Sequence, residues 1–359
     1  TASHNPAEYN GMKVSRENAL PVGYDTGLGQ IKEWIEAGRE CPVAEKRGEV
    51  HQIDVRKDYL PFLLKYKEDW SGLKIAMDVS NGMASLFVHE IFGDEPAYIY
   101  DNMDGTFPNH EPNPLVPKNV VDLQKLVAAT KADIGIIFDG DADRVMFVDE
   151  NSRFISPDLM IAVLGHYFLE ERGEKGYIHQ DIRSSKAVGE YLAPMGGVMN
   201  TWRVGRAYAA LKLRELDGVY GGELAGHYYF RDFFYSDSGL LAAILIVNVA
   251  AKMKAQGVSL SQLIGRIEKY QNSGEINFRL EDKKGAMDAV RDYFMQKEKS
   301  TAYMDFDGYR VEFPDWWFNI RPSNTEPYLR FICEATSKEL LDEKVAKVRE
   351  ILTDQFGAK

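Results

Sequence analysis

The chain has 359 residues, long enough for two to four domains with separate cores, and its apolar and charged fractions of 45% and 27% are those of ordinary globular proteins. A net charge of −12 and the lack of basic runs argue against nucleic acid as a partner, although a few arginines can still form a pocket for a small anion. Two cysteines, Cys41 and Cys333, cannot form a disulfide framework, so we expect a reducing compartment, the cytoplasm.

The first part of the chain changes character near residue 50. Residues 1–50 are rich in glycine and turn residues and contain one helical stretch at 29–38, so we interpret them as the end of a domain. A regular pattern follows, with buried strands expected at 73–79, 133–138 and 145–148 and a helix at 120–132. This strand–helix–strand order predicts α/β layers with a largely parallel sheet.

A second α/β unit is expected from about 156 to 268, with a helix at 157–171, a strand at 176–182 and a helix at 185–193. The apolar stretch at 239–251 is broken by Asn248 and is shorter than a membrane span, so we interpret it as a buried core helix and expect no membrane partner. The pattern then changes to an α+β domain. Its strands are expected at 275–280, 309–313, 316–321 and 328–335, and its helices near 285–297 and at the C-terminus.

The sharpest chemical signal is FDGDADRVMFVDE at 138–150, in which Asp139, Asp141 and Asp143 alternate. Three carboxylates this close are unfavourable unless a hard cation lies among them, and oxygen ligands suit Mg²⁺ or Ca²⁺. An EF-hand is the main alternative, but it needs glycine where Arg144 stands, and the flanking residues resemble strands. The simplest alternative is a solvated acidic turn. We predict a metal loop at a strand end.

A second polar segment, FNIRPSNTEPYLRF at 318–331, lies between two apolar strands. Hydroxyls, an amide, turn backbone N–H groups and guanidinium groups are the components of a phosphate site. A plain polar hairpin turn would use the same residue types. The candidate phosphate ligands are Arg321, Ser323, Asn324, Thr325 and Arg330.

A third segment, YGGELAGHYYF at 220–230, combines glycines with polar side chains. Gly222 and its neighbours would let the backbone approach a ligand, and the Glu223 carboxylate can accept hydrogen bonds from two sugar hydroxyls, with His227 close by. A glycine-rich bend with a surface carboxylate is the alternative. Arg183, Arg203 and Arg206 add positive charge nearby, but isolated surface arginines are common.

The chain begins with TASHNPAEYNGMK, in which Ser3 is too near the start to lie within its own helix or strand. A serine hydroxyl is a poor nucleophile alone, but a phosphorylated serine is a phosphoryl donor that needs a cation and groups that move protons. The aspartate loop would supply the cation, and His4 or Lys13 would move protons. The opening segment is therefore a candidate catalytic loop.

Taken together, these motifs resemble those of the α-D-phosphohexomutases, and among them the chain is most similar to the bacterial phosphomannomutase branch. TASHNPAEYNGMK resembles the phosphoserine loop, FDGDADR the Mg²⁺ loop, GGELAGH the sugar-selecting loop and RPSNTEP the phosphate-binding loop. NHEPNPL at 109–115 and HYYFRDFFYSDSG at 227–239 agree as well. The resemblance covers essentially the whole chain.

The resemblance implies a multidomain α/β architecture, with repeated domains built on mixed sheets and a smaller C-terminal α+β domain. Family members carry further residues before the serine, so the first domain is expected to be truncated. We see no internal repeat in the sequence itself. The implied domains are 1–50 with the phosphoserine loop, 51–155 with the metal loop, 156–270 with the sugar loop and 271–359 with the phosphate loop.

By the same resemblance, Ser3 is the phosphorylated nucleophile, its phosphate shares Mg²⁺ with the three aspartates, and Arg144 contacts that phosphate. His4 and Lys13 move protons, while Glu223, Gly222 and His227 bind the sugar. Arg321, Ser323, Asn324, Thr325, Arg330 and Arg183 bind the other phosphate. The implied reaction interconverts mannose 6-phosphate and mannose 1-phosphate through a hexose 1,6-bisphosphate, which also acts as activator, in a monomer or homodimer.

Two departures bear on the substrate. Ala225 stands where the sugar loop usually has serine, which removes one hydroxyl, and Asn324 favours the phosphomannomutase or dual-specificity branch. Phosphoglucomutase activity, alone or shared, is the alternative within the enzyme class. A truncated module that binds phosphosugars without turnover is the alternative outside it.

Overall fold

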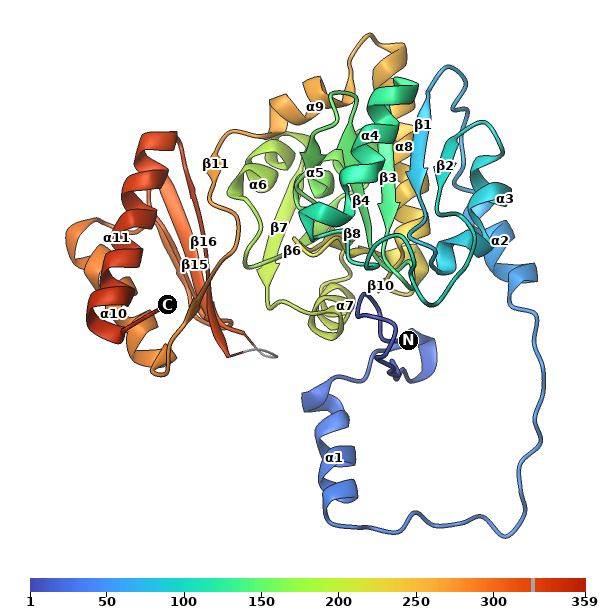
Figure 1. Cartoon of the computed structure of the whole chain (residues 1–359), viewed down its shortest axis with the longest axis horizontal. Helices are drawn as coiled ribbons and strands as arrows, with labels where there is room; N and C mark the ends of the chain where they lie inside the picture. The colour runs from blue at the N-terminus through green and yellow to red at the C-terminus, as the bar shows by residue number, and fades with distance from the viewer. Residues whose placement is uncertain (324–326) are drawn as a thin grey trace.

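The computed structural model describes residues 1–323 and 327–359, and its strands form three sheets (Figure 1). In the first sheet the order is β2-β1-β3-β4-β5, with β1 parallel to β2 and β3, and with β4 antiparallel to both β3 and β5. The sheet is therefore mixed and not largely parallel, because short turns connect β3, β4 and β5 and such turns join only antiparallel strands. Its strands are β1 Ile75–Asp78, β2 Ala97–Ile99, β3 Ile134–Phe138, β4 Val145–Asp149 and β5 Phe154–Ile155.

The second sheet repeats the first. Its order, β7-β6-β8-β9-β10, follows the same sequence of neighbours, with β6 parallel to β7 and β8 and the last two pairs antiparallel. The expectation of repeated α/β domains with mixed sheets is thus confirmed, although the sequence itself displays no repeat. The strands are β6 Gly176–Asp181, β7 Gly197–Trp202, β8 Tyr220–Gly222, β9 Tyr228–Phe230 and β10 Ser236–Asp237. We call β1–β5 and β6–β10, with their helices, the first and second α/β units.

Helices cover both faces of these sheets. α4 (Val121–Thr130) packs on one face of the first sheet, and α7 (Arg206–Glu215) packs on the second. One continuous core, which includes α8 (Gly239–Ala255) and α5 (Leu159–Gly165), joins the two units. The remaining helices of this body are α2 Arg56–Leu64, α3 Val88–Phe92, α6 Lys186–Leu192, α9 Leu260–Ile267 and the π-helical turn His166–Glu171 that continues α5.

The apolar stretch at 239–251 forms most of α8, as predicted. Its side chains are buried around almost the whole circumference, because α8 packs between elements of both α/β units. Asn248 is satisfied inside this core, donating to the Tyr66 carbonyl at 2.8 Å and accepting from Trp70 Nε1 at 2.6 Å. Among the described residues no single helix is long and apolar enough to cross a membrane, and α8 and α9 meet that criterion only together, as a pair bent by 103°.

The C-terminal unit, drawn in orange and red at the left of Figure 1, is an antiparallel sheet with two helices on one face and has its own core. Strands β11 and β12 both pair with β16, and the order continues as β16-β15-β14-β13. Its strands are β11 Gln271–Asn272, β12 Ile276–Arg279, β13 Ala302–Met304, β14 Tyr309–Glu312, β15 Trp316–Pro322 and β16 Tyr328–Ala335, and its helices are α10 Lys283–Lys297 and α11 Lys338–Phe356.

Buried polar contacts join the C-terminal unit to the second α/β unit. Arg310 on β14 donates through Nη1 to the carbonyls of Ile182 and Ser184, at 2.9 and 2.6 Å. Glu334 on β16 accepts from Ser185 Oγ at 2.7 Å. Arg310 and Glu334 are both almost fully buried. Separating the two units would break their hydrogen bonds, and a buried polar group without a partner is energetically costly.

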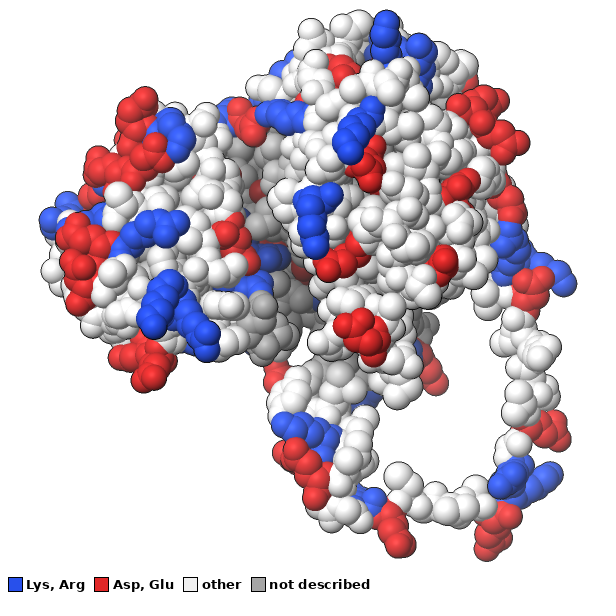
Figure 2. Space-filling model, in the orientation of Figure 1, with Lys and Arg blue, Asp and Glu red and all other residues white. Residues whose placement is uncertain are grey.

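The N-terminal residues run along the α/β body. The first loop lies against the turn that follows β3, α1 (Leu28–Glu36) stands away from the body, and residues 39–54 return to α2 without helix or strand (Figure 1). On the face in Figure 2, basic and acidic side chains are interspersed. A polynucleotide-binding surface would instead gather its positive side chains into one patch.

Candidate active site

The turn between β3 and β4 carries the three aspartates of the predicted metal loop. One oxygen each from Asp139, Asp141 and Asp143 lies within 4.8 Å of the others. Burial raises the pKa of Asp139 well above its usual range, and the neighbouring Asp143 charge adds to the shift. The Oδ1 atoms of Asp141 and Asp143 are buried and have no hydrogen-bond partner in the described part of the chain. Oxygens left in this state fit a divalent cation.

The secondary structure on both sides of this loop excludes an EF-hand. β3 and β4 form an antiparallel pair, with Phe138 opposite Val145, where an EF-hand would place helices. Glu150, which falls at the last ligand position of that loop type, accepts hydrogen bonds from the Ser261 backbone N–H at 3.0 Å and from its Oγ at 2.5 Å. Its carboxylate is therefore used at the start of α9 and not by the aspartate cluster.

The opening segment brings Ser3 onto the metal loop. Ser3 Oγ lies 3.4 Å from Asp139 Oδ2 and 3.4 Å from His4 Nδ1. Ser3 has φ 59°, an uncommon conformation for a residue with a side chain. The close approach depends on Gly140, because a Cβ there would lie only 2.5 Å from the Ser3 carbonyl oxygen.

The two candidate proton-transfer residues differ in their surroundings. Lys13 Nζ donates to Asp141 Oδ2 at 2.7 Å and also contacts Asp143. Burial alone would lower the pKa of Lys13, but the charges and hydrogen bonds of these two carboxylates raise it overall. Burial, with the positive charges of Arg144 and His227, lowers the pKa of His4 to about 4. At neutral pH His4 is thus uncharged beside Ser3, whereas Lys13 is a cation held by the metal loop.

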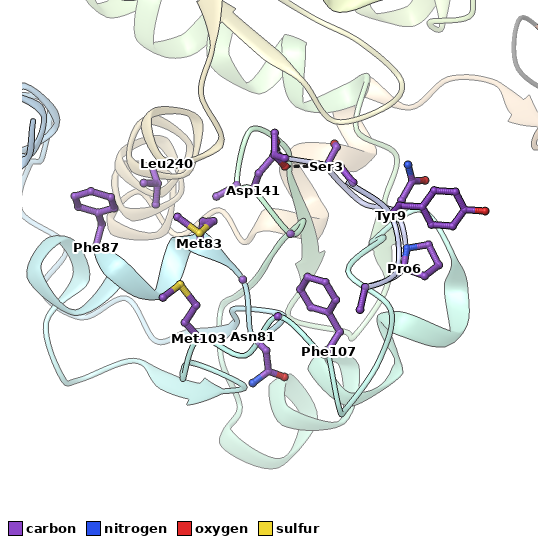
Figure 3. A pocket seen from close by; sticks show the side chains of 18 of the residues that line it. Ser3, Pro6, Tyr9, Asn81, Met83, Phe87, Met103, Phe107, Asp141 and Leu240 are labelled. Atoms are coloured by element: carbon purple, nitrogen blue, oxygen red, sulfur yellow. Dashed lines mark hydrogen bonds between the residues drawn. The ribbon is translucent and has the colours of Figure 1, made fainter. Parts of the chain in front are cut away.

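A pocket of about 800 Å³ opens beside this serine loop (Figure 3). Its lining includes Ser3 and Asp141, but much of the wall is apolar, with Met83, Phe87 and Phe107 among the side chains. Neither the predicted sugar ligand Glu223 nor the arginines predicted to bind phosphate line it. The polar contacts of the candidate site instead extend from the aspartate loop through Arg144 to His227 of the second α/β unit.

The predicted sugar loop is the turn between β8 and β9, the same position in the second unit that the predicted metal loop has in the first. The two turns touch: Arg144 and His227 form a β-bridge, and the Val145 N–H donates to the Gly226 carbonyl at 3.1 Å. Gly226 has φ 85°, which favours glycine. The structure therefore joins two loops that lie about 80 residues apart in the sequence.

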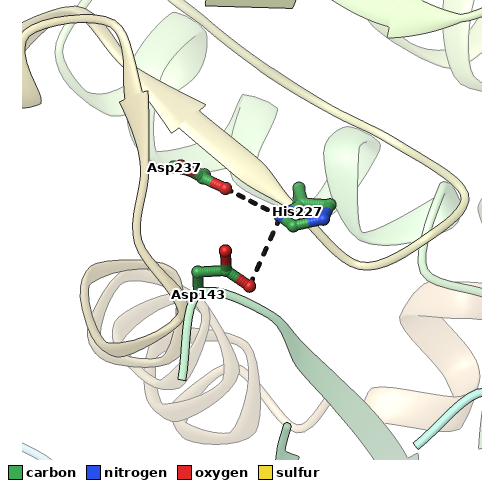
Figure 4. A group of neighbouring side chains, drawn as sticks. All are labelled: Asp143, His227 and Asp237. Carbon is green, nitrogen blue, oxygen red and sulfur yellow. Dashed lines mark ion pairs between the residues drawn. The ribbon is translucent and has the colours of Figure 1, made fainter. Parts of the chain in front are cut away.

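His227 connects the two loops electrostatically. Its Nε2 accepts from Arg144 Nε at 3.0 Å, which places the proton of the neutral ring on Nδ1. That nitrogen lies 2.8 Å from Asp237 Oδ2 and 3.7 Å from Asp143 Oδ1 (Figure 4). Burial would lower the pKa of His227, but the Asp237 carboxylate, with help from Asp143, raises it overall.

Glu223 is buried within the sugar loop. Its Oε1 accepts from the Gly205 N–H at 3.2 Å and from the Tyr229 hydroxyl at 3.0 Å, and burial raises its pKa. Gly222 lies inside β8, where a Cβ would meet Ile161 Cγ1 at 2.7 Å, so its missing side chain makes room for α5. The carboxylate is thus held rigidly, whereas the glycine serves packing.

Arg183 lies at the end of β6, beside the sugar loop. Asp181 fixes its guanidinium with two contacts, Nε to Oδ1 at 3.0 Å and Nη2 to Oδ2 at 2.9 Å. The same Asp181 accepts from the Leu224 N–H at 2.7 Å. Asp181 therefore fixes both the arginine and the sugar loop, a role that no signal in the sequence indicated.

Two further arginines face each other on the C-terminal sheet. Arg321 on β15 pairs in register with Arg330 on β16, and like charges directly opposite are destabilising unless an anion balances them. Arg321 is only 4% exposed, and its Nε has no hydrogen-bond partner among the residues described. Burial and the charge of Arg183 lower its pKa. This arrangement suits a bound anion.

The predicted phosphate loop is the hairpin that joins these strands. Ser323 donates its backbone N–H to the Tyr328 carbonyl at 2.8 Å, which closes the hairpin. Asn324 and Thr325 lie outside the described residues. The structure thus brings together Ser3, His4, Lys13, the three aspartates, Arg144, Glu223 and His227 in one contact network, and it adds Arg183 through Asp181.

Three residues of this network are not indicated as site residues by the sequence: Asp181, Tyr229 and Asp237. Asp237 pairs with His227 and accepts from Arg206 Nε at 2.7 Å. Each supports another side chain, and such residues carry no spacing pattern of their own. Arg203 differs from Arg206, because it lies 3.8 Å from Asp25 and its guanidinium covers the Tyr208 ring.

Comparison with known proteins gives consistent matches. Family models for phosphoglucomutase/phosphomannomutase match α/β/α domain II at residues 57–152, α/β/α domain III at 156–270 and the C-terminal domain at 275–351. Phosphomannomutases from Salmonella montevideo and Methanocaldococcus jannaschii are 37% and 34% identical, over 98% of this chain and 78% of each relative. The crystal structure of a phosphoglucomutase/phosphomannomutase family protein from Burkholderia thailandensis has a TM-score of 0.84 at 29% identity, covering 98% of this chain and 75% of that one. The chain belongs to the phosphoglucomutase/phosphomannomutase family of phosphohexomutase enzymes.

Proposed function

We propose that this phosphohexomutase interconverts mannose 6-phosphate and mannose 1-phosphate through a phosphoserine at Ser3 and a hexose 1,6-bisphosphate. The observation that carries the proposal is the 3.4 Å approach of Ser3 Oγ to Asp139, which lies 136 positions away in the sequence. The names of the curated relatives support mannose as the sugar. A hydroxyl held against an acidic metal loop is well placed for phosphoryl transfer.

The metal in this proposal is Mg²⁺, which Asp139, Asp141 and Asp143 would hold together with the phosphate on Ser3. The buried Oδ1 atoms of Asp141 and Asp143, which accept no hydrogen bond from the described residues, support it, because Mg²⁺ prefers carboxylate ligands. Bound Mg²⁺ would neutralise charge on the phosphoryl group. Arg144, whose Nε lies 3.6 Å from Asp139 Oδ2, would contact the same phosphate.

The free hydroxyl of the hexose phosphate attacks the phosphorus of phosphoserine. A bond from phosphorus to the sugar oxygen would form while the bond from phosphorus to Ser3 Oγ breaks. The proton of the attacking hydroxyl would pass to a nearby base, and the Ser3 oxygen released as an alkoxide would take up a proton. His4 is the best-placed acceptor, because its Nδ1 lies 3.4 Å from Ser3 Oγ, whereas Lys13 is tied to two carboxylates. Most of the rate acceleration would come from positioning and charge neutralisation.

The rest of the substrate would lie toward the second α/β unit and the C-terminal hairpin. Glu223 and His227 would hold the sugar hydroxyls. The other phosphate would bind Arg321, Ser323 and Arg183, with Arg330 in support and with Asn324 and Thr325 as sequence-based additions. The bisphosphate then turns around and returns its second phosphate to Ser3, and added bisphosphate acts as the activator.

Phosphoglucomutase activity, alone or shared, is the second candidate. Ala225 removes a hydroxyl from the loop proposed to contact the sugar, and this change does not select between the glucose and mannose epimers. The Burkholderia relative's family name also covers both sugars.

The test is a ³¹P NMR time course with Mg²⁺ and a trace of hexose 1,6-bisphosphate, run with mannose 1-phosphate and glucose 1-phosphate in parallel. Conversion of mannose 1-phosphate to the 6-phosphate, faster than or equal to that of glucose 1-phosphate, is expected. Faster conversion of glucose 1-phosphate would favour the second candidate. No conversion of either sugar by a protein shown to carry phosphoserine would point to another phosphosugar or to a binding module.

A further inference from the structure

An acidic side chain, Glu275, lies among the arginines of the candidate phosphate site. It reaches this position through a β-bulge at the edge of the C-terminal sheet. Three residues, Ser273–Glu275, lie opposite two residues of β16, because Asn272 pairs with Glu334 and Ile276 pairs with Phe331. Bulges of this kind redirect side chains and occur near active sites.

The conformation of the bulge is fixed by a glycine and by hydrogen bonds. Gly274 has φ 66°, a conformation that favours glycine, and its N–H donates to Asn272 Oδ1 at 2.7 Å. Ser273 exchanges hydrogen bonds with Cys333 on β16, which fixes the bulge against the sheet. Glu275 is therefore presented by an ordered turn.

Glu275 contacts arginines from two different units. Its Oε1 lies 3.2 Å from Arg330 Nη1 on β16, and its Oε2 lies 3.9 Å from Arg183 Nη1 at the end of β6. These are two of the guanidinium groups assigned to the phosphate. Asp181 already pairs with Nε and Nη2 of Arg183, so Glu275 places a second carboxylate beside this arginine, on the side of Nη1.

We propose that Glu275 is a displaceable counter-anion that occupies Arg183 and Arg330 until the phosphate of the hexose phosphate replaces it. The inference rests on the proposed function and deepens it. A carboxylate at this point weakens phosphate binding, because the incoming phosphate must displace a charge already paired there. A bisphosphate that has to leave the arginines and return in the opposite orientation gains from this weakening, because tight binding would slow its release.

The experiment measures binding of mannose 6-phosphate by calorimetry and turnover by a coupled assay, on the full chain. Glu275→Gln removes the charge and keeps the shape of the side chain. We expect the Kd of mannose 6-phosphate to fall about 3- to 10-fold, as loss of one partly exposed charge competitor implies, with KM and kcat both lower than in the wild type. In Glu275→Asp the carboxylate is one methylene further from the arginines, so the Kd of this variant should lie between those of the wild type and Glu275→Gln.

Glu281→Gln is the matched control, because Glu281 is exposed on the same unit just after β12. The Kd of this variant for mannose 6-phosphate should equal that of the wild type. The gain in Glu275→Gln should also shrink in about 1 M salt, where the screening length is only about 3 Å. Equal or weaker binding by Glu275→Gln, in protein with wild-type thermal stability, would overturn the counter-anion role. If the wild type neither binds nor converts any hexose phosphate, the proposed function itself fails, so the two failures are distinct.

Discussion

Ser3 depends on its neighbours for any reactivity, because an isolated serine hydroxyl is a weak nucleophile and a weak acid. In the structure those neighbours are Asp139 and His4, each 3.4 Å from Oγ, and none of the three is exposed. The charge and hydrogen bonding at this one atom are therefore set by residues from both ends of the first 140 positions.

We predict that Ser3→Ala lowers turnover by at least about 10³-fold, as loss of a nucleophile does in enzymes of covalent mechanism. Binding of the hexose bisphosphate should persist, because the arginines and Glu223 are untouched. A coupled assay and calorimetry on the same preparation would measure both. Ser71→Ala, in an exposed turn of the first α/β unit, is the control. Undiminished turnover in Ser3→Ala would exclude Ser3 as the nucleophile.

Arg321 is almost fully buried, and its Nε has no hydrogen-bond partner among the described residues. A second prediction is that Arg321→Gln raises the KM for hexose phosphate about 10- to 100-fold, since a hydrogen bond to a charged group contributes about 1.5–3 kcal/mol. Its thermal stability without ligand should not fall, because the variant no longer buries a guanidinium whose Nε lacks a hydrogen-bond partner among the described residues. Thermal melts with and without inorganic phosphate would separate the two effects, with Arg266→Gln on α9 as control. An unchanged KM would contradict the assignment.

At the scale of elements, the two turns of the candidate site hold equivalent positions in a repeated sheet. The metal loop follows the third strand of the first unit, and the sugar loop follows the third strand of the second. Each is a tight antiparallel connection, so its side chains project from a rigid base. The bridge between Arg144 and His227 then fixes one turn against the other.

The fit of the serine loop on the metal loop depends on Gly140. We predict that Gly140→Ala reduces kcat about 100-fold with the fold intact, because a Cβ 2.5 Å from the Ser3 carbonyl must push that loop away, and a shift of about 1 Å is this costly. Steady-state kinetics and circular dichroism would check it. Gly265→Ala, where nothing lies within 4 Å of the added Cβ, should keep wild-type activity. Wild-type kcat in Gly140→Ala would show that the serine loop tolerates displacement.

At the scale of the whole molecule, the contact between the second α/β unit and the C-terminal unit determines whether the arginines of β15 and β16 face Arg183. Glu334 lies within that contact and accepts from Ser185 Oγ, Trp317 Nε1 and Asn272 Nδ2 at 2.7–2.9 Å. Burial, with the nearby Asp158 charge, raises the pKa of Glu334 to about 7 from its usual 4.5. The contact between the units is therefore expected to depend on pH.

Folded Glu334 keeps its proton up to about pH 7, whereas the unfolded chain releases it near pH 4.5, so the folded state binds more protons between these values. Stability should therefore fall as the pH rises through this window, by about 2–3 kcal/mol from this residue. Denaturant unfolding of wild type and Glu334→Gln at pH 5 and pH 8 measures it. The variant should lose less stability than the wild type, and Glu339→Gln on α11 should behave as wild type. Parallel pH dependence in all three would refute the prediction.

Much of the fold was predictable because it depends on local patterns. Runs such as 133–138 and 145–148 alternate or concentrate apolar residues over a few positions, and they form β3 and β4 as expected. The long C-terminal helix and the core helix α8 were found in the same way. Strands of three residues, such as β8 and β9, are too short to carry such a pattern, and the sequence there indicates only a glycine-rich segment.

The sequence by itself determined the chemistry on offer: three alternating carboxylates, a serine segment, a sugar-type carboxylate and an arginine hairpin, each encoded within a few consecutive residues. The tertiary structure alone decided which of them meet. The repeated topology places two turns opposite each other, Asp181 and Asp237 hold Arg183 and His227, and a bulge directs Glu275 onto the arginines. These contacts join residues many tens of positions apart, and pairing at that distance depends on the packing of whole sheets, which no local pattern records.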